Sequence, residues 1–420
     1  MSPLLPPPLR RRNFLLYFAG QIFSNTGVWF QNLALSLWIV ETTESALALS
    51  MVAVCQFTPM LLLSAPAGAV ADRFSPRSIL FVTAPLMMLC AGALAVAAAS
   101  GHDELVTLLG IIALSGVVQA FDRTAGQAFL YELVGPRELG SAVSLNTVAM
   151  SAARSLGPGL AGLTYAAAGA TTCFTINALT YSSVLLALCL MNPRHFAEKR
   201  ARTTKSNEGA IRALLRDPTL RRLFVTNIAV TVLAMNFMVV VTAMVTITLA
   251  GDPAQLGAAH ALNAVGAVIG GLIISALTHR GTRVVAFATA TLGLALGAAA
   301  FSPNPLIFLL LSPLIGLGLG AFQSSLNSTV QMLSPPGLLG RSAGLLTLSS
   351  VGVAPVGAVI AGSIIDGSSA RVALLVGTVT CLLCGAVLAR GGDRSPEPAP
   401  EHVPLPRQPR QVCRRDPFSP

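Results

Sequence analysis

The sequence predicts an all-α integral membrane protein with twelve transmembrane helices arranged in two pseudo-symmetric six-helix bundles. Three observations lead to this fold class: an unusually apolar composition, twelve long apolar stretches, and similar motifs in the two halves. Of the 420 residues, 53% are hydrophobic and 10% are charged, and the mean hydropathy is +0.71. Because soluble domains carry charge on roughly a quarter of their residues, this composition excludes a soluble enzyme, a fibrous chain and a disordered protein.

Each predicted helix is a stretch of about 20 or more mainly apolar residues, the length needed to cross a bilayer. The twelve stretches cover residues 14–39, 47–70, 79–100, 104–130, 143–168, 171–192, 223–250, 255–278, 283–301, 304–332, 341–366 and 369–389. Short connections join most of them, and the longest polar stretch between them lies at the middle of the chain.

Positive charge is concentrated on one side of the predicted membrane. With the N-terminus in the cytoplasm, 24 of the 27 Lys and Arg residues fall in cytoplasmic segments, and Arg371 is the only one on the opposite face. This pattern satisfies the positive-inside rule, so we expect a multi-pass protein of the plasma membrane with both termini in the cytoplasm. It also accounts for the net charge of +10 without a nucleic-acid partner.

The two halves of the chain share short motifs. Ala120-Phe121, Leu133, Pro136, Leu139-Gly140 and Pro158 correspond to Ala321-Phe322, Leu333, Pro336, Leu339-Gly340 and Pro355, about 200 residues later. A parallel duplication of six helices is typical of transporters that bind substrate between two halves. The expected domains are a cytoplasmic segment (1–13), a first bundle (14–192), a cytoplasmic linker (193–222), a second bundle (223–389) and a disordered cytoplasmic tail (390–420).

The loop between the second and third stretches carries Gly68, Asp72, Arg73 and Arg77. This spacing resembles a loop signature of the major facilitator superfamily. In a gate, Gly68 would let helix backbones approach, Asp72 would neutralise the N-terminus of a neighbouring helix, and the arginines would hold carboxylates or lipid phosphates. The alternative is a positive-inside loop with an incidental salt bridge.

The fourth, fifth and sixth stretches carry further motifs. They read Ala120-Phe121-Asp122-Arg123-Thr124-Ala125-Gly126-Gln127-Ala128, Asn146, Ala153-Arg154-Ser155-Leu156-Gly157-Pro158-Gly159-Leu160-Ala161-Gly162 and Phe174-Thr175-Ile176-Asn177-Ala178. These motifs resemble the exporter branch of the superfamily, which includes enterobactin and other siderophore exporters, macrolide-efflux proteins and natural-product exporters. The resemblance covers nearly the whole chain and implies the major facilitator fold. Thr124 and Gly126 depart from the branch, which commonly has Pro and Arg at these positions.

Gly157, Pro158 and Gly162 form a helix-packing motif in the fifth stretch. The motif resembles a signature that implies antiport rather than symport. Its glycines permit close packing between the bundles, and Pro158 removes one helical hydrogen bond and so favours a bend. A purely structural kink explains these residues equally well, so the antiport interpretation depends on the resemblance.

Three charged residues, Asp122, Arg123 and Arg154, fall inside predicted helices. A charge inside the membrane costs about 2.5 to 3.5 kcal/mol on insertion scales, so each needs a partner or a wet cavity. One hypothesis makes Asp122 the carrier of the coupling proton, with an arginine changing its proton affinity as the cavity opens and closes. The other hypothesis is a permanent buried ion pair between the fourth and fifth helices.

Polar side chains on three stretches are candidates for a substrate cavity. They are Gln21, Asn25, Trp29 and Asn32 on the first stretch, Asn227 and Asn236 on the seventh, and Gln323 and Asn327 on the tenth. Because an unpaired amide in hydrocarbon costs several kcal/mol, each amide either faces a cavity or hydrogen-bonds between helices. A pocket of amides and aromatic rings with few charges suits a bulky, moderately apolar organic compound.

No motif in the chain indicates enzymatic chemistry. A G-x-x-x-x-G-K-[ST] phosphate loop is absent, so the energy for transport must come from an ion gradient. Cys381 and Cys384 have metal-like spacing, but an apolar helix without a second pair of ligands indicates packing. We expect no enzymatic activity, no cofactor and no metal. The expected partners are a small-molecule substrate, protons and the lipid bilayer, with no nucleic acid, and the expected state is a monomer.

The predicted function is export of a drug, antibiotic, siderophore or other secondary metabolite by proton antiport and alternating access. One proton that moves through 100 mV supplies about 2.3 kcal/mol for this work. Two alternatives remain: uptake or facilitated diffusion by the same fold, and a membrane sensor that transports nothing. A sensor would have a larger extramembrane domain than the short outer loops provide.

Overall fold

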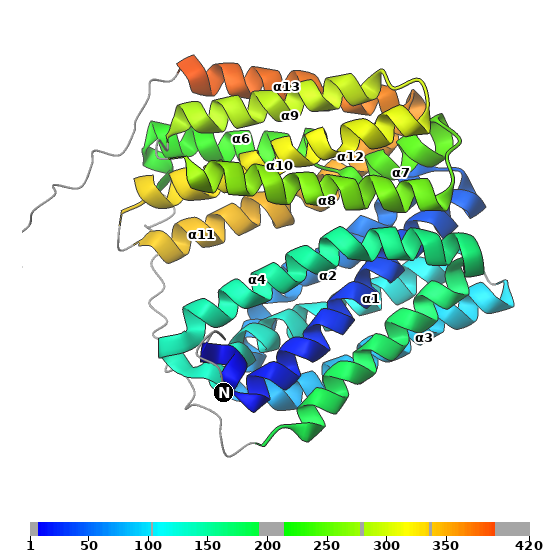
Figure 1. Cartoon of the computed structure of the whole chain (residues 1–420), viewed down its shortest axis with the longest axis vertical. Helices are drawn as coiled ribbons and strands as arrows, with labels where there is room; N and C mark the ends of the chain where they lie inside the picture. Colours follow the sequence, from blue (N-terminus) through cyan, green and yellow to red (C-terminus); the bar gives the residue numbers. More distant parts are fainter. Residues whose placement is uncertain (1–6, 102–103, 193–213, 278–280, 336–337, 391–420) are drawn as a thin grey trace, which may run out of the picture.

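The computed structural model of the chain describes residues 7–101, 104–192, 214–277, 281–335 and 338–390. Every regular element in these ranges is a helix (Figure 1). The elements are η1 (Pro7–Arg10), α1 (Arg12–Thr43), α2 (Ala46–Arg73), α3 (Pro76–Ser100), α4 (Leu105–Leu190), α6 (Pro218–Ala234), α7 (Phe237–Ala243), η3 (Met244–Thr248), α8 (Pro253–Ala276), α9 (Thr282–Ala300), α10 (Pro305–Leu333), α11 (Leu339–Thr347), η5 (Leu348–Gly352), α12 (Ala354–Gly367) and α13 (Ala370–Arg390). Residues 1–6, 193–213 and 391–420, which belong to the expected N-terminal segment, linker and tail, lie outside the described residues.

Helix α4 contains the fourth, fifth and sixth predicted helices in one run. Its backbone departs from helical geometry at Gly135 and Gly169, where φ is 72° at both positions. A side chain would clash at such a positive φ, so glycine allows the chain to turn there without strain. The two glycines fall between the predicted stretches 104–130, 143–168 and 171–192. The predicted gaps between these three helices therefore coincide with the two turns in α4.

The described helices provide twelve crossings of the membrane, as predicted. Ten stretches are long and apolar enough to cross, and one of them, Glu138–Leu190, has 53 residues and holds two crossings separated by Gly169. Helix α1 is not among the ten because its amide side chains lower its mean hydropathy, but its 32 residues are sufficient to span a bilayer.

Two predicted helices of the second bundle are interrupted in the structure. The seventh predicted helix is divided into α6, α7 and η3, and the side chain of Asn236 donates a hydrogen bond to the carbonyl of Val232 at 2.8 Å beside the break. The eleventh is divided into α11, the π-helical η5 and α12. Pro355 lies in the first turn of α12 and has no N–H to donate to the preceding turn, which accounts for the wider turn before it.

Polar caps set the starts of several helices. Helix α6 begins at Pro218 rather than at residue 223, because Asp217 accepts hydrogen bonds from the backbone N–H groups of Thr219 and Leu220 at 2.7 and 3.3 Å. Helix α8 begins with a capping box between Asp252 and Gln255.

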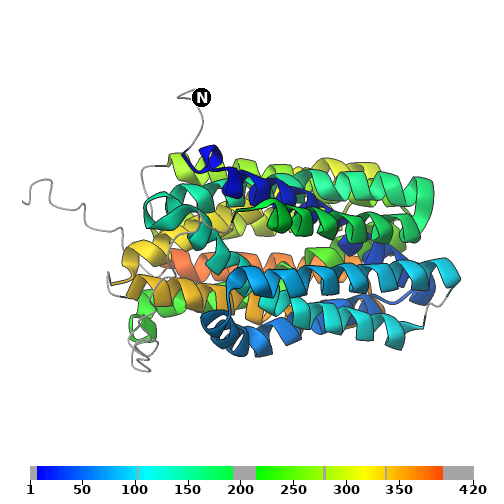
Figure 2. The same ribbon diagram turned by 90° about the horizontal axis from the view of Figure 1, so that it is seen from below.

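The helices form two bundles that run along a common direction, as the two ribbon views show (Figures 1 and 2). Helices α1–α4 form the first bundle, and α6–α13 form the second. In Figure 1 the ends of η1 and α13 that continue to the chain termini lie on the same side of the molecule. The two bundles meet along α4, α8, α2 and α12.

Candidate functional site

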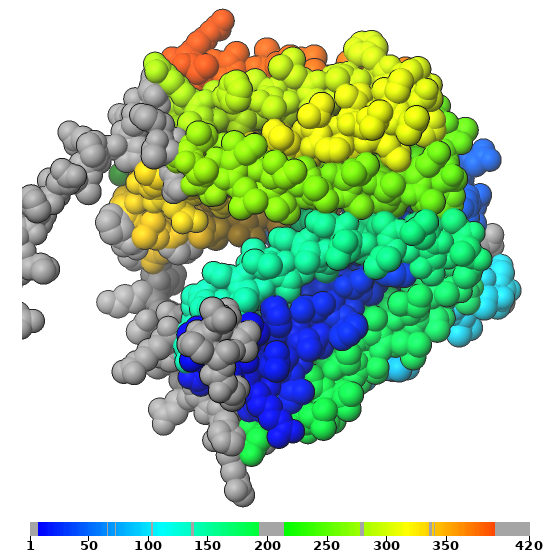
Figure 3. Space-filling view, viewed as in Figure 1, coloured from blue at the N-terminus to red at the C-terminus, as the bar shows by residue number. Residues whose placement is uncertain are grey.

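The bundles are in contact at one end and separate at the other. Figure 3 shows a hollow between α11 and α4 on the side where η1 and the end of α13 lie. At the opposite end one apolar cluster crosses between the bundles, with Leu37 and Leu49 on one side and Met244 and Leu256 on the other. The hollow is therefore open toward the end that carries both described chain ends and closed toward the other.

A close crossing of α4 and α8 helps to seal the closed end. A methyl group on Gly162 would lie 2.6 Å from the carbonyl oxygen of Pro253 and 2.9 Å from the Cα of Gly257. A methyl group on Gly257 would lie 2.5 Å from the carbonyl oxygen of Pro158. Only glycine fits this approach, so Pro158 and Gly162 of the predicted packing motif lie at the contact between the bundles.

A carboxylate of the second bundle also joins the first bundle at the closed end. Asp366, near the end of α12, accepts hydrogen bonds from the Ser45 hydroxyl at 2.6 Å and from the backbone N–H groups of Ala46 and Leu47 at 2.7 and 3.0 Å. These N–H groups begin α2 and have no partner within that helix. The contact therefore caps a helix of one bundle with a side chain of the other.

A polar cavity of about 240 Å³ lies between α1, α3 and α4 in the first bundle. It is lined by Tyr17, Gln21, Ser24, Asn25, Val28, Ala84, Met87, Gln119, Asp122, Arg123, Gly126, Gln127, Leu130, Asn146, Met150, Tyr181 and Val184. The structure thus brings four of the predicted residues together: Gln21, Asn25, Asp122 and Arg123. Amides, phenols and thioethers surround one acid and one guanidinium, which suits an organic ligand with polar groups on an apolar frame.

Asp122 is held by a neutral partner. The hydroxyl of Thr83 on α3 donates a hydrogen bond to its Oδ1 atom at 2.7 Å. Arg123 is exposed at the cavity and interacts electrostatically with Asp122, but no salt bridge joins Asp122 to Arg123 or Arg154 within the described part of the chain. The carboxylate is consequently placed beside cationic charge without a direct ion pair.

Arg154 lies over an aromatic ring of the same bundle. Its guanidinium carbon is 5.8 Å from the ring centroid of Trp29, a cation–π contact. Gly157, one turn later, packs against the same side chain, because a methyl group there would lie 2.6 Å from the Cβ of Trp29. Arg154 is exposed and close enough to Arg123 for the two charges to repel each other, so the side of the bundle near the cavity carries excess positive charge.

The remaining amides of the predicted substrate cavity lie elsewhere. Asn227 is 2% exposed and donates hydrogen bonds to the hydroxyls of Ser349 and Ser350 at 2.7 and 2.9 Å. The side chains of Gln323 and Asn327 are exposed on α10, and Asn327 donates to the carbonyl of Gln323. None of them lines the cavity of the first bundle, and neither do Trp29, Asn32 and Asn236.

The predicted gating loop joins α2 to α3. Gly68 is half-buried in α2, Arg73 is the exposed last residue of that helix, and the side chain of Asp72 lies outside the described residues. Arg77 donates a hydrogen bond to the carbonyl of Leu188 at 2.7 Å. Arg77 therefore fixes the start of α3 against the end of α4.

Sequence reasoning did not identify three of the cavity residues, Tyr17, Gln119 and Tyr181. Tyr17 lies four residues before Gln21 and thus on the same face of α1, a signal that was available in the sequence. The Oε1 atom of Gln119 is buried and has no hydrogen-bond partner among the described residues. A buried acceptor without a partner is costly, so this atom points to a donor supplied by water or by a ligand.

The departure at Gly126 also has a structural explanation. A methyl group at this position would lie 3.1 Å from the hydroxyl of Tyr17, so a side chain there would shift that hydroxyl by a few tenths of an ångström. Among the described residues, no group of three or more His, Cys, Asp or Glu side chains is arranged to hold a metal ion.

The sequence matches known transporters. Residues 2–402 match the family described as Transmembrane secretion effector. The multidrug efflux pump Tap of Mycolicibacterium fortuitum is 25% identical over 390 residues, which cover 90% of this chain and 95% of that protein. The staphyloferrin A transporter of Staphylococcus aureus is 26% identical over 263 residues, which cover 61% of this chain and 66% of that protein.

Solved structures share the fold. A bacterial homologue of the iron transporter ferroportin, in an inward-facing state, superposes with a TM-score of 0.69 at 18% identity and covers 91% of this chain and 98% of its own. The nucleoside transporter NupG superposes with a TM-score of 0.70 at 12% identity, with coverages of 90% and 98%. The fold and the match over nearly the whole chain agree, and the chain belongs to the transmembrane secretion effector family of the major facilitator superfamily.

Proposed function

We propose that this protein exports a small, moderately apolar organic compound from the cytoplasm by alternating access, driven by proton antiport. The observation that carries the proposal is the polar cavity around Asp122, in a molecule whose bundles are separate at one end and sealed at the other. An alternating-access cycle requires such a conformation and a second one in which the sealed end opens. Two relatives named as a multidrug efflux pump and a staphyloferrin A transporter support organic compounds as substrates.

The cavity supports a substrate with both apolar and polar groups. Met87, Met150 and Val28 provide adaptable apolar surface, and Gln21 and Asn25 provide hydrogen-bonding groups. Methionine side chains repack around ligands of different shape, so such a surface favours a range of related compounds over one small ion.

Asp122 is the residue that we assign to proton coupling. Its partner Thr83 is neutral, so protonation of the carboxylate breaks no salt bridge and leaves the helices packed. The carboxylate of Asp122 cannot hold a proton and at the same time bind, as an anion, a hydrogen-bond donor of the substrate. Such exclusion is what an antiporter needs, because the carrier then returns with a proton whenever it has released its substrate.

The orientation of the protein in the membrane and its cellular location are inferred from the charge distribution. We assign the open end to the cytoplasm, because the described chain ends lie there and the positive-inside rule places them in the cytoplasm. The protein would then act in the plasma membrane as a monomer without enzymatic activity, with bundles at 14–192 and 223–389 moving against each other. Gly68, Asp72, Arg73 and Arg77 would control the cytoplasmic opening.

The test uses everted membrane vesicles that hold an inward proton gradient reported by acridine orange. A macrolide, a tetracycline and a hydroxycarboxylate siderophore are added in turn, and vesicles without the protein serve as the control. Antiport of any of them should release protons and restore fluorescence. Accumulation that continues after an uncoupler has removed the gradient, with ATP present, would contradict proton coupling. Accumulation only in right-side-out vesicles would indicate uptake.

A further inference from the structure

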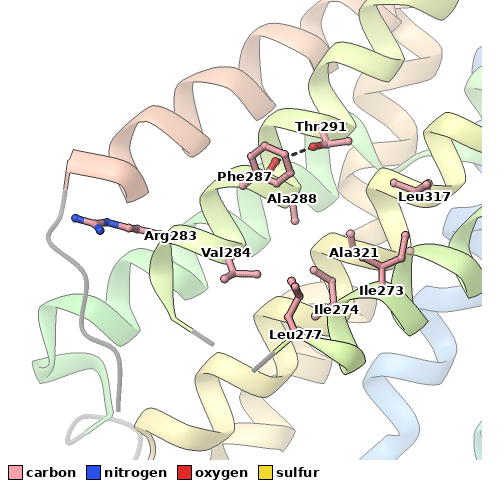
Figure 4. Close-up of a pocket in the computed structure, with 11 residues that line it drawn as sticks. Ile273, Ile274, Leu277, Arg283, Val284, Phe287, Ala288, Thr291, Leu317 and Ala321 are labelled. Carbon is pink, nitrogen blue, oxygen red and sulfur yellow. Dashed lines mark hydrogen bonds between the residues drawn. The ribbon is translucent and has the colours of Figure 1, made fainter. Parts of the chain in front are cut away.

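A second cavity, of about 290 Å³, lies in the second bundle on the surface formed by α8, α9 and α10 (Figure 4). Helices α8 and α9 each pack on α10, which forms the floor of a groove between them. All of its lining residues are apolar except Arg283 and Thr291. The Thr291 hydroxyl donates to the carbonyl of Phe287 at 3.0 Å, so it offers the groove no free donor.

This groove faces away from the cleft between the bundles. Helix α9 lies on the far side of α8 and α10 from the first bundle (Figure 1). Large apolar side chains at the groove remain exposed, with Phe287 75%, Ile273 48% and Leu277 43% exposed. In a membrane these side chains contact lipid, so the groove is open to the bilayer and separate from the cavity around Asp122.

Arg283 borders one end of the groove, and its position has a counterpart in the first bundle. Arg77 and Arg283 are each the second residue of a helix, α3 and α9, and each has a phenylalanine four residues later. Arg77 lies over Phe81 at 5.3 Å from the ring centroid and donates to the carbonyl of Leu188. The side chain of Arg283 extends away from the apolar residues of the groove, beyond one end of them (Figure 4).

We propose that this groove holds an acyl chain of an anionic phospholipid whose phosphate is bound by Arg283. The apolar walls match the chain, and the planar guanidinium matches a phosphate with two parallel hydrogen bonds. A long arginine side chain at the end of a membrane helix reaches the headgroup region while its stem stays against apolar surface. This site goes beyond the transport function, and its occupant is a lipid of the leaflet that meets the open end.

The test is competition between two lipids that share their chains and differ in headgroup charge. The purified full-length protein in neutral detergent is mixed with equal amounts of palmitoyl-oleoyl phosphatidylglycerol and palmitoyl-oleoyl phosphatidylcholine, and bound lipid is measured by native mass spectrometry. The anionic lipid should be retained about fivefold more, the factor expected for one arginine near an anionic headgroup. Arg283→Gln should remove this preference, whereas Arg390→Gln, an exposed arginine at the end of α13, should keep it.

A second variant tests the groove itself. Val284→Trp fills the space between α8 and α9 and leaves Arg283 in place, so it should reduce retention of the anionic lipid to the level of the neutral one. Arg283→Lys keeps the positive charge and should keep part of the preference for the anionic lipid. If Arg283→Gln folds poorly, the lysine variant shows whether the position tolerates substitution. Preference that survives Arg283→Gln, or retention that survives Val284→Trp, would overturn the proposal. So would equal retention of both lipids by the unchanged protein.

Discussion

Asp366 of the second bundle and Ser45 of the first are joined by a hydrogen bond of 2.6 Å at the closed end of the molecule. The same carboxylate receives two backbone N–H groups at the start of α2, so one side chain neutralises the positive end of a helix in the opposite bundle. In the proposed alternating-access cycle the bundles separate here when the closed end opens, so these bonds would break in that step. They therefore stabilise the present conformation relative to the alternative one.

The substitution Asp366→Asn should shift the protein toward the conformation that is open at the other end. It removes the charge and keeps the size, and an acid at a helix start is worth about 0.3 to 2 kcal/mol. A change of about 1 kcal/mol alters the ratio of conformations roughly fivefold. Distances between spin labels on the two bundles, measured by pulsed electron paramagnetic resonance, would report the ratio.

Asp252→Asn is the matched control for this measurement. Asp252 also caps a helix, α8, but its partner Gln255 belongs to the same helix. The control should lower stability slightly and leave the distances unchanged. If both substitutions shifted the distances equally, the contact between Asp366 and Ser45 would have no special part in closing the molecule.

Gly162→Ala should prevent complete closure of the same end. The new methyl group would be 2.6 Å from the carbonyl oxygen of Pro253, a backbone atom that can move only with its helix. Overpacking of this kind costs about 1 to 3 kcal/mol, which changes the conformational ratio by about fivefold or more. The nearby Gly159→Ala makes only an ordinary contact of 3.5 Å with Ala261 and should transport normally. Equal transport by both variants in the vesicle assay would contradict a role for the close crossing.

The helices were predictable because each depends on a local property of the chain. A run of apolar residues must become a helix in a bilayer, where every backbone group needs an internal partner. Gly135 and Gly169 separated the three helices within α4 for an equally local reason. The interruption at Asn236 was not predicted. At the break Asn236 donates to the carbonyl of Val232 and lies close to Gly357 of α12, a neighbour far away in the sequence.

The candidate site was predictable only in part, for the same reason. The spacing of about 100° between helical residues places Gln21, Asn25 and Asn32 on one face of α1. Gln21 and Asn25 line the cavity, but Asn32 does not. Periodicity could not show that Asn227 would bond to Ser349, which is 122 residues away. An amide in an apolar helix needs a partner, but its sequence does not say whether that partner is a ligand or another helix. Tyr17 was missed because a tyrosine among apolar residues fits lipid contact equally well.

Substitutions of two of these amides should separate structural from functional roles. Asn227→Ala removes one buried and one partly buried hydrogen bond and leaves Ser349 and Ser350 without this donor, so it should cost about 1 to 3 kcal/mol and lower Tm. Gln21→Ala opens the cavity wall and should leave Tm nearly unchanged while it weakens transport. Thermal unfolding in detergent and the vesicle assay measure the two effects. The reverse pattern would place substrate recognition at Asn227.

The last prediction decides between the two hypotheses for Asp122. Asp122→Asn can still accept the hydrogen bond from Thr83, and the acid has no salt bridge among the described residues, so the variant should fold with nearly unchanged Tm. It cannot titrate, so export driven by the proton gradient should fail and substrate binding should lose its pH dependence. Thr83→Val is the control, because it removes the neutral partner and keeps the acid. A well-folded Asp122→Asn protein that still exports against a gradient would exclude the proton-carrier role. Loss of about 3 to 5 kcal/mol of stability, restored by also replacing Arg123 with Gln, would instead favour a buried ion pair.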